Sequence, residues 1–157
     1  SSTSRGLGDV YKRQTTFRSS FKTLNEEWLK KYFTIEPYDA LLLENCESEI
    51  INKGGHIFFG IDNNEVIATY AFLPTTNKCV ELGKMAVTET HQGKGYGQQL
   101  LKHVFETARI LGYTEIVLYS NRILQNSIHL YKKYGFKEVS NIDSPYKRGD
   151  IKMLIKL

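Results

Sequence analysis

Gln92-Gly93-Lys94-Gly95-Tyr96-Gly97 is a glycine-rich stretch between the apolar run Met85-Ala86-Val87 and a segment, 100–111, whose apolar residues have helical spacing. Together they predict a strand-loop-helix unit. Closely spaced glycines let successive backbone N–H groups converge, and a helix N-terminus adds roughly half a positive charge. A pyrophosphate is the natural ligand of such a loop, with Lys94 as a mobile charge at its rim. A tight turn that binds nothing is the alternative.

The order of these residues excludes two familiar nucleotide-binding loops. A P-loop has the form Gly-x-x-x-x-Gly-Lys-Ser/Thr, whereas Lys94 is followed by Gly95 and Thr88 stands where the first glycine belongs. A Rossmann loop needs a third glycine three residues after the second, and that position is Gln98. Neither nucleotide-binding fold fits.

The segments around the loop predict an α/β fold of the α+β type. Upstream, helical spacing indicates helices over 21–33 and 38–52, the second ending before Gly54-Gly55. Three strands of an antiparallel meander are predicted over 56–61, 65–73 and 80–87. Downstream, the predicted elements are a strand over 115–119, a helix over 124–134 and strands over 136–139 and 151–157. We therefore expect a single mixed, mostly antiparallel central sheet flanked by helices.

Length and composition bound the class of protein. The chain has 157 residues, 41% of them hydrophobic, which is enough for one domain to bury a core without disulfides or metals. We expect 1–14, rich in Ser, Gly, Lys and Arg, to be a tail, either disordered or adaptor-derived and non-native, and 15–157 to be the domain. Apolar runs are too short for a membrane span, and only two cysteines favour a reduced, cytoplasmic protein.

The net charge of +4 comes from 21 Lys and Arg against 17 Asp and Glu. Such a balance would suit nucleic acid or a phosphorylated ligand, but the basic residues are scattered, with the densest cluster at Lys147-Arg148. We therefore expect no nucleic-acid and no membrane partner. The four histidines, His56, His91, His103 and His129, have no metal-like spacing, so no metal is expected either.

The loop matches the pattern Gln/Arg-x-x-Gly-x-Gly/Ala, and this resembles the acetyl-CoA-binding loop of the GNAT superfamily of N-acetyltransferases. Three further stretches resemble the same family in the right order: Glu81–Val87 its fourth strand, Leu118–Asn121 the end of its fifth, and Ser127–Phe136 its final helix and turn. The resemblance spans about residues 57–137. It implies the GNAT fold and acetyl-CoA as cosubstrate. Family members usually begin with a strand before the first helix, a place held here by 14–20.

The resemblance implies two catalytic residues. An amine must be neutral to attack a thioester, and the departing thiolate needs a proton. Glu81 lies eleven residues before Gln92, where the family often carries a carboxylate, and its apolar neighbours could raise its pKa. An ordinary solvent-facing glutamate is the alternative. Tyr131 matches the family's tyrosine by its offset from Gly135-Phe136 and would be the acid; it also occupies a packing position, and Tyr134 is the weaker rival.

The resemblance also assigns residues around the cosubstrate. Pantetheine would insert between the family's fourth and fifth strands, where Gly83 could mark a bulge and the N–H of Met85 would polarise the thioester carbonyl. Asn121 and Asn126 could bond to the pantetheine arm or cap the following helix. The cofactor-binding residues implied are Met85, Ala86, Val87, Gln92, Gly93, Lys94, Gly95, Tyr96, Gly97, Gln98, Asn121 and Asn126.

The first two helices usually wall the acceptor side in this family. The substrate-binding candidates are Trp28, Tyr32, Phe33 and Glu36, with Glu27 beside them. Carboxylates next to aromatic rings would suit a cationic amine. Docking of the helix on the sheet is the alternative for Trp28 and Tyr32, and both a small-molecule and a peptide amine stay open.

The main hypothesis is an N-acetyltransferase that works by direct attack in a ternary complex, because neither Cys46 nor Cys79 has the flanking pattern of a nucleophilic thiolate. An acyl-CoA-binding sensor without turnover is the alternative from another class of function. A monomer and a homodimer are both compatible with the sequence.

Overall fold

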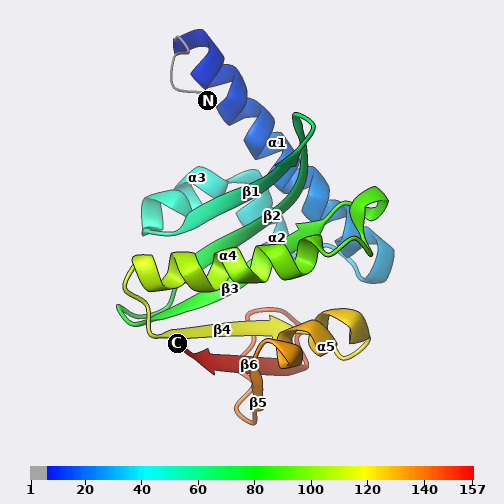
Figure 1. The fold of residues 1–157 in the computed structure, drawn as a ribbon, viewed down its shortest axis with the longest axis vertical. Helices are drawn as coiled ribbons and strands as arrows, with labels where there is room; N and C mark the ends of the chain where they lie inside the picture. The colour runs from blue at the N-terminus through cyan, green and yellow to red at the C-terminus, as the bar shows by residue number, and fades with distance from the viewer. Residues whose placement is uncertain (1–6) are drawn as a thin grey trace.

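One six-stranded sheet, with strand order β1-β2-β3-β4-β6-β5, organises the computed structural model, which describes residues 7–157 and side chains from residue 16 onward (Figure 1). The strands are β1 His56–Asp62, β2 Glu65–Pro74, β3 Cys79–Val87, β4 Glu115–Ser120, β5 Lys137–Val139 and β6 Ile151–Lys156. Every neighbouring pair is antiparallel except β3 and β4. The predicted mixed, mostly antiparallel sheet is confirmed.

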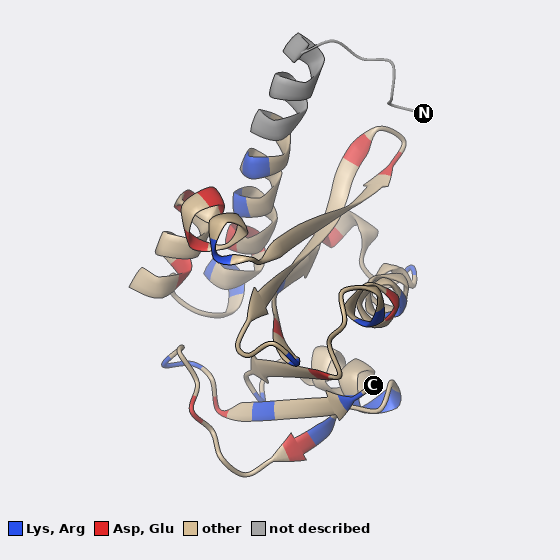
Figure 2. Ribbon diagram, turned by 90° about the vertical axis from the view of Figure 1, so that its left-hand side faces the viewer, with Lys and Arg blue, Asp and Glu red and all other residues tan. Residues whose placement is uncertain are grey.

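The helices cover both faces of this sheet. Helices α1 Leu7–Tyr32, α2 Pro37–Glu44 and α3 Cys46–Glu49 lie on one face, and α4 Tyr96–Ile110 and α5 Gln125–Lys133 lie on the other (Figures 1 and 2). Short 3-10 turns, η1 Ile51–Lys53 and η2 Glu89–His91, precede β1 and the glycine loop. Lys and Arg are interspersed with Asp and Glu in Figure 2, as the scattered charges of the sequence predict.

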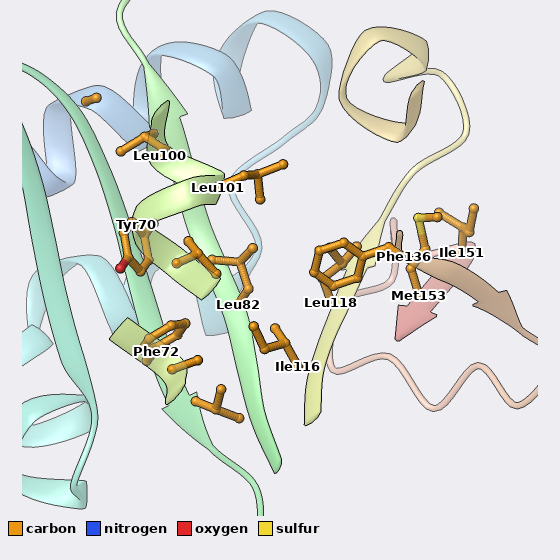
Figure 3. Close-up of a cluster of buried hydrophobic side chains, with 14 of the residues drawn as sticks. Tyr70, Phe72, Leu82, Leu100, Leu101, Ile116, Leu118, Phe136, Ile151 and Met153 are labelled. Carbon is orange, nitrogen blue, oxygen red and sulfur yellow. The ribbon is translucent and has the colours of Figure 1, made fainter. Parts of the chain in front are cut away.

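Two hydrophobic cores form because successive side chains of a strand point to opposite faces. From β2, Tyr70 and Phe72 enter the core under α4, whereas Ala71 and Leu73 enter the core under α1 and α2. The α4-side core continues through Leu82, Ile116 and Leu118 to Phe136, Ile151 and Met153 (Figure 3). The sheet is therefore held from both sides, and β2 is almost wholly buried.

The first hairpin has the turn that its sequence demands. Asn63 and Asn64 adopt positive φ angles of 48° and 62° between β1 and β2. Two-residue hairpin turns of this kind need the left-handed region at both positions, and asparagine tolerates it better than most residues with a Cβ. This turn starts the antiparallel meander β1-β2-β3, which confirms the predicted one.

Three features of the N-terminal part differ from the sequence-based or family-based expectation. The single helix expected over 38–52 is wrong: it is divided into α2, α3 and η1, because the backbone at Asn45 leaves the helical region with φ −123° and ψ 43°. Leu42, Leu43, Cys46 and Ile50 stay buried across the break, so their spacing could not reveal it. The first helix is longer than predicted and includes residues 7–14 of the expected tail, while 1–6 lie outside the described residues. Within residues 7–157, α1 precedes β1 with no strand before it.

Replacing Leu101 with alanine tests the α4-side core. Leu101 is fully buried between α4 and the sheet, and its truncation leaves a cavity, so we expect Leu101→Ala to lower the free energy of unfolding by about 2–5 kcal/mol. Ile110 on the same helix is 77% exposed, and Ile110→Ala should change stability by less than about 0.5 kcal/mol. Urea denaturation measures both. Equal effects of the two variants would contradict this packing of α4.

Candidate active site

The parallel strands β3 and β4 separate and leave a cleft between them. They pair only where Cys79–Glu81 lies beside Glu115–Val117. Next to this point β3 carries one extra residue: Thr69 and Ala71 of β2 are two apart, but their partners Ala86 and Gly83 are three apart. Such a bulge bends the strand and stops its pairing. The bulge predicted at Gly83 is thus present, and its left-handed residue is Lys84, with φ 51°.

The cleft has a volume of about 870 Å³ and brings together most of the residues singled out in the sequence. Both catalytic candidates, Glu81 and Tyr131, line it. So do Met85, Ala86, Val87, Gln92, Gly93, Gly95, Tyr96, Gly97, Gln98, Asn121, Asn126, Trp28, Tyr32 and Phe33. Lys94, Glu36 and Glu27 are the predicted residues outside this lining. Lys94 is an exposed residue of the loop, and Glu27 accepts at Oε1 from the backbone N–H of Glu89 at 2.8 Å.

The glycine loop delivers the N-terminus of α4 to one end of the cleft. Gly93 and Gly95 have positive φ angles of 75° and 84°, which residues with a Cβ rarely adopt. The side chain of Gln92 holds the turn by donating from Nε2 to the Val87 carbonyl, 2.9 Å away. The N–H groups of the first turn of α4, from Tyr96 to Gln98, have no acceptor within the helix. They and the helix dipole form a site for an anion.

Glu81 lies in β3 at the point where the strands part. Glu81 is 7% exposed. Burial raises the pKa of its carboxyl to about 7, although the charge of Lys84 opposes this rise. The structure therefore excludes the solvent-facing alternative: the Glu81 carboxyl is buried and its pKa lies near neutral pH.

Tyr131 lies in α5 on the opposite side of the cleft. Burial raises the pKa of its phenol to about 12, so it stays protonated at neutral pH. Its ring also packs edge-on against Phe136, 5.7 Å between centroids, so the packing position and the cleft position coincide. The rival, Tyr134, donates from its hydroxyl to Gln98 Oε1 at 3.1 Å.

The two asparagines differ in their surroundings. Asn121 donates from Nδ2 to the Arg148 carbonyl at 2.7 Å and accepts at Oδ1 from the N–H of Ile123 at 2.9 Å. These bonds hold the turn before α5, which favours the capping alternative for Asn121. Asn126 lies exposed in the first turn of α5 at the cleft.

Two of the residues expected to bind the acceptor belong to an aromatic wall, formed by Trp28, Phe33 and Tyr146, around Arg148. The guanidinium carbon lies 4.3 Å from the centroid of the Tyr146 ring, 5.5 Å from Trp28 and 5.8 Å from Phe33. Glu36 is bound to the same segment: its carboxylate accepts from the backbone N–H groups of Lys147 and Arg148 and from Arg148 Nη1. Because these bonds and the charge of Arg148 already neutralise the Glu36 carboxylate, the structure gives little support for a role of Glu36 in binding a cationic amine.

Sequence reasoning missed a buried ion network beside Glu81. Asp39 of α2 accepts from Lys84 Nζ at 2.5 Å and from both terminal nitrogens of Arg148, at 2.6 Å and 2.8 Å. Tyr146 accepts from Lys84 Nζ at 3.1 Å. The only sequence signal was a lysine inside an apolar strand. Strand alternation would place Lys84 on the face opposite Glu81, and the bulge reverses that.

The mixed sheet, the glycine loop and the cleft between β3 and β4 are the features that the resemblance to the GNAT superfamily implies. The sequence profile of the Acetyltransferase (GNAT) family matches residues 18–136, so the chain belongs to the GNAT family of N-acetyltransferases. It is similar to the uncharacterized N-acetyltransferase YvbK of Bacillus subtilis, with 31% identity over 105 residues that cover 65% of this chain and 68% of YvbK. The chain spans less than half the length of mammalian N-acetyltransferases that it also matches.

Solved structures agree with this assignment. A GNAT acetyltransferase of Staphylococcus aureus Mu50 superposes with a TM-score of 0.80, covering 90% of this chain and 93% of that one, at 21% identity, and so supports the fold. A GNAT acetyltransferase of Elizabethkingia anophelis with acetyl-CoA bound is 28% identical, with a TM-score of 0.61 and coverage of 79% and 92%.

Within residues 7–157, no helix has the length and apolarity needed to cross a bilayer. Among the side chains from residue 16 onward, no group of three or more His, Cys, Asp and Glu could hold a metal ion.

Replacing Glu81 with glutamine should change the pH dependence of stability. The folded state holds the Glu81 proton up to about pH 7, whereas the unfolded chain releases it near 4.5, so wild-type stability falls as the pH rises through this interval. Glutamine cannot ionise. The free energy of unfolding of Glu81→Gln minus that of wild type should therefore be about 2–3 kcal/mol larger at pH 8 than at pH 5, at about 1.4 kcal/mol per pKa unit.

Urea denaturation of both proteins at the two pH values measures this difference. Glu106→Gln, at an exposed position of α4, controls for the loss of a surface carboxylate. The same stability difference between Glu81→Gln and wild type at pH 5 and pH 8 would show that the Glu81 carboxyl is not held neutral by burial.

Proposed function

We propose that the chain transfers the acetyl group of acetyl-CoA to a primary amine of a small molecule or a peptide, by direct attack in a ternary complex. The observation that carries the proposal is the cleft itself, in which a buried carboxyl with a pKa of about 7 and a protonated phenol face the same space as the glycine loop. These are the groups that amine deprotonation and thiolate protonation require.

Acetyl-CoA fits the residues at the two ends of the cleft. The free N–H groups at the start of α4 and the positive-φ glycines of the loop would hold the pyrophosphate, with Lys94 at the rim. The pantetheine arm would lie along Met85, Ala86 and Val87, where β3 has no β4 partner. The cosubstrate supplies an activated acetyl thioester.

In the proposed reaction Glu81 takes a proton from the acceptor ammonium, directly or through a water. The neutral nitrogen then bonds to the acetyl carbon, while the N–H of Met85 donates to the thioester oxygen. The carbon–sulfur bond breaks as the attacking nitrogen releases its second proton to solvent, and Tyr131 gives its proton to the leaving sulfur and regains one from solvent. A base with a pKa near the working pH and an acid that stays protonated suit these two steps.

The acceptor would enter along the aromatic wall formed by Trp28, Phe33 and Tyr146. The anions behind this wall, Glu36 and Asp39, are neutralised by Arg148 and Lys84. Because few free negative charges remain there, these contacts favour an acceptor whose single reacting amine lies beside the aromatic rings, and they disfavour a polycation.

Glu81→Gln and Tyr131→Phe test the assigned roles. We expect each variant to lower kcat by about 100-fold or more while leaving acetyl-CoA affinity within a few-fold, since each removes a proton-transfer group. Thiol release from acetyl-CoA is followed with 2-phenylethylamine, spermidine and a lysine-containing tetrapeptide. Tyr134→Phe is the matched control and should stay near wild-type activity.

Two outcomes would refute the proposal. Full activity of Glu81→Gln and Tyr131→Phe would overturn the residue roles. Tight acetyl-CoA binding without thiol release for any amine would instead favour the acyl-CoA sensor.

Gly95→Ala tests the loop as the cosubstrate site. Gly95 and Gly112 share a positive φ, 84° and 87°, and a Cβ at either meets no atom within 4 Å, so alanine should strain the two positions alike. Of these two glycines, Gly95 lines the cleft and Gly112 does not. Calorimetric titration with acetyl-CoA should show at least about a tenfold loss of affinity for Gly95→Ala, about 1.4 kcal/mol, and little change for Gly112→Ala. Equal losses would contradict a cosubstrate site at this loop.

A further inference from the structure

Lys84 is a buried ammonium at the floor of the cleft. Its side chain is 1% exposed, and its nitrogen lies 2.5 Å from Asp39 Oδ1, 3.1 Å from the Tyr146 hydroxyl and 4.3 Å from the centroid of the Tyr146 ring. Asp39 is itself completely buried and is shared with Arg148. Lys84 therefore has a full set of partners and is fixed between α2, β3 and the segment before β6.

Two local rules are broken at this one residue. A non-glycine residue with positive φ is uncommon, and glycine or asparagine would suit the bulge better. Burying a charged pair is also a weak source of stability, because well-packed apolar side chains often serve as well. Such conflicts between sequence and structure concentrate at functional sites. Stability alone does not account for a lysine at this position.

The bulge brings Lys84 to the face of β3 that carries Glu81. Leu82 points into the α4-side core, and after the bulge Met85 and Val87 do so as well, so Lys84 joins Glu81 on the other face. Within residues 16–157, the titratable groups that face Glu81 are the Lys84 ammonium, the Asp143 carboxylate and the neutral phenols of Tyr38, Tyr119 and Tyr146. Lys84 is the cation in this set.

Burial and Asp143 both favour the neutral form of the Glu81 carboxyl, and Lys84 opposes them. Without the ammonium, Glu81 would hold its proton at neutral pH and could not accept one from an amine. Burial lowers the pKa of Lys84 to about 8, and the Asp39 carboxylate opposes this effect and favours the charged ammonium.

We infer that Lys84, fixed by Asp39 and Tyr146, is a positioning residue for acetyl transfer: its buried ammonium keeps the Glu81 carboxylate available as the base. This inference rests on the proposed role of Glu81. It adds a residue that acts through Glu81 and does not touch the reacting atoms.

Carboxyl-¹³C NMR of protein labelled with [5-¹³C]glutamate measures the titration of Glu81 without any ligand, and the signal missing from Glu81→Gln assigns it. We expect Lys84→Met to raise the midpoint of the Glu81 titration by about one pH unit, the scale of a nearby opposite charge. Lys84→Arg should restore the midpoint. Lys156→Met, the same change at an exposed position of β6, should leave it unmoved.

If Lys84→Met does not fold, Lys84→Gln removes the charge, keeps a hydrogen-bond donor for Asp39 and leaves the contact of Asp39 with Arg148 in place, so it answers the same question. An unchanged Glu81 midpoint in the folded variant overturns the inference. Thiol release measured across pH with the three amines then tests the proposed function separately. If the NMR midpoint rises and the acid limb of activity does not follow it, Lys84 still controls the charge of Glu81, and the role of Glu81 as the base is wrong.

Discussion

A single extra residue in β3, opposite Tyr70, is the constraint on which the site depends. Before it, Leu82 faces the core under α4; after it, Met85 and Val87 do, so the alternation of the strand is reversed. The bend also ends the pairing of β3 with β4 after Glu81. One insertion thus opens the cleft, leaves the backbone of Met85 and Val87 without a β4 partner, and turns a lysine toward the base.

The bulge in turn requires charge compensation deep in the fold. A buried ammonium needs an anion, and Asp39 supplies it from α2 while holding Arg148 in a two-bond contact. Arg148 is stacked on Tyr146 and bound to Glu36. These contacts tie the end of α1 and the start of α2 to the segment before β6, more than 100 residues later in the chain, and so hold the aromatic wall together.

Local patterns were enough to predict the sheet and the glycine loop, and the resemblance to the GNAT family supplied most of the cleft-lining residues. Alternation in 65–73 and 80–87 predicts two strands of the meander, and the offset of Tyr131 from Gly135 predicts its place on α5. The break at Asn45 could not be predicted, since the buried positions on both sides keep helical spacing. The ion network could not either, because Asp39, Lys84 and Arg148 meet only through tertiary contacts, and the face of Lys84 depends on where the bulge falls.

Opposing effects on one carboxyl explain why a costly lysine stands at the bulge. Burial strengthens the interactions of Glu81 with the cleft but stabilises its protonated form, and a base that is never ionised is useless. A nearby cation limits that rise and leaves the pKa near the pH at which a base is both ionised and strong enough. In the proposed reaction Tyr131 has the opposite role, and burial raises the pKa of its phenol to about 12, so it keeps its proton. The two candidates differ first in their ordinary acidity, a carboxyl with a pKa near 4.5 and a phenol with a pKa near 10, and burial raises both values. The buried ammonium of Lys84 limits the rise at Glu81 and so keeps the two pKa values apart, as an acid and a base at one site require.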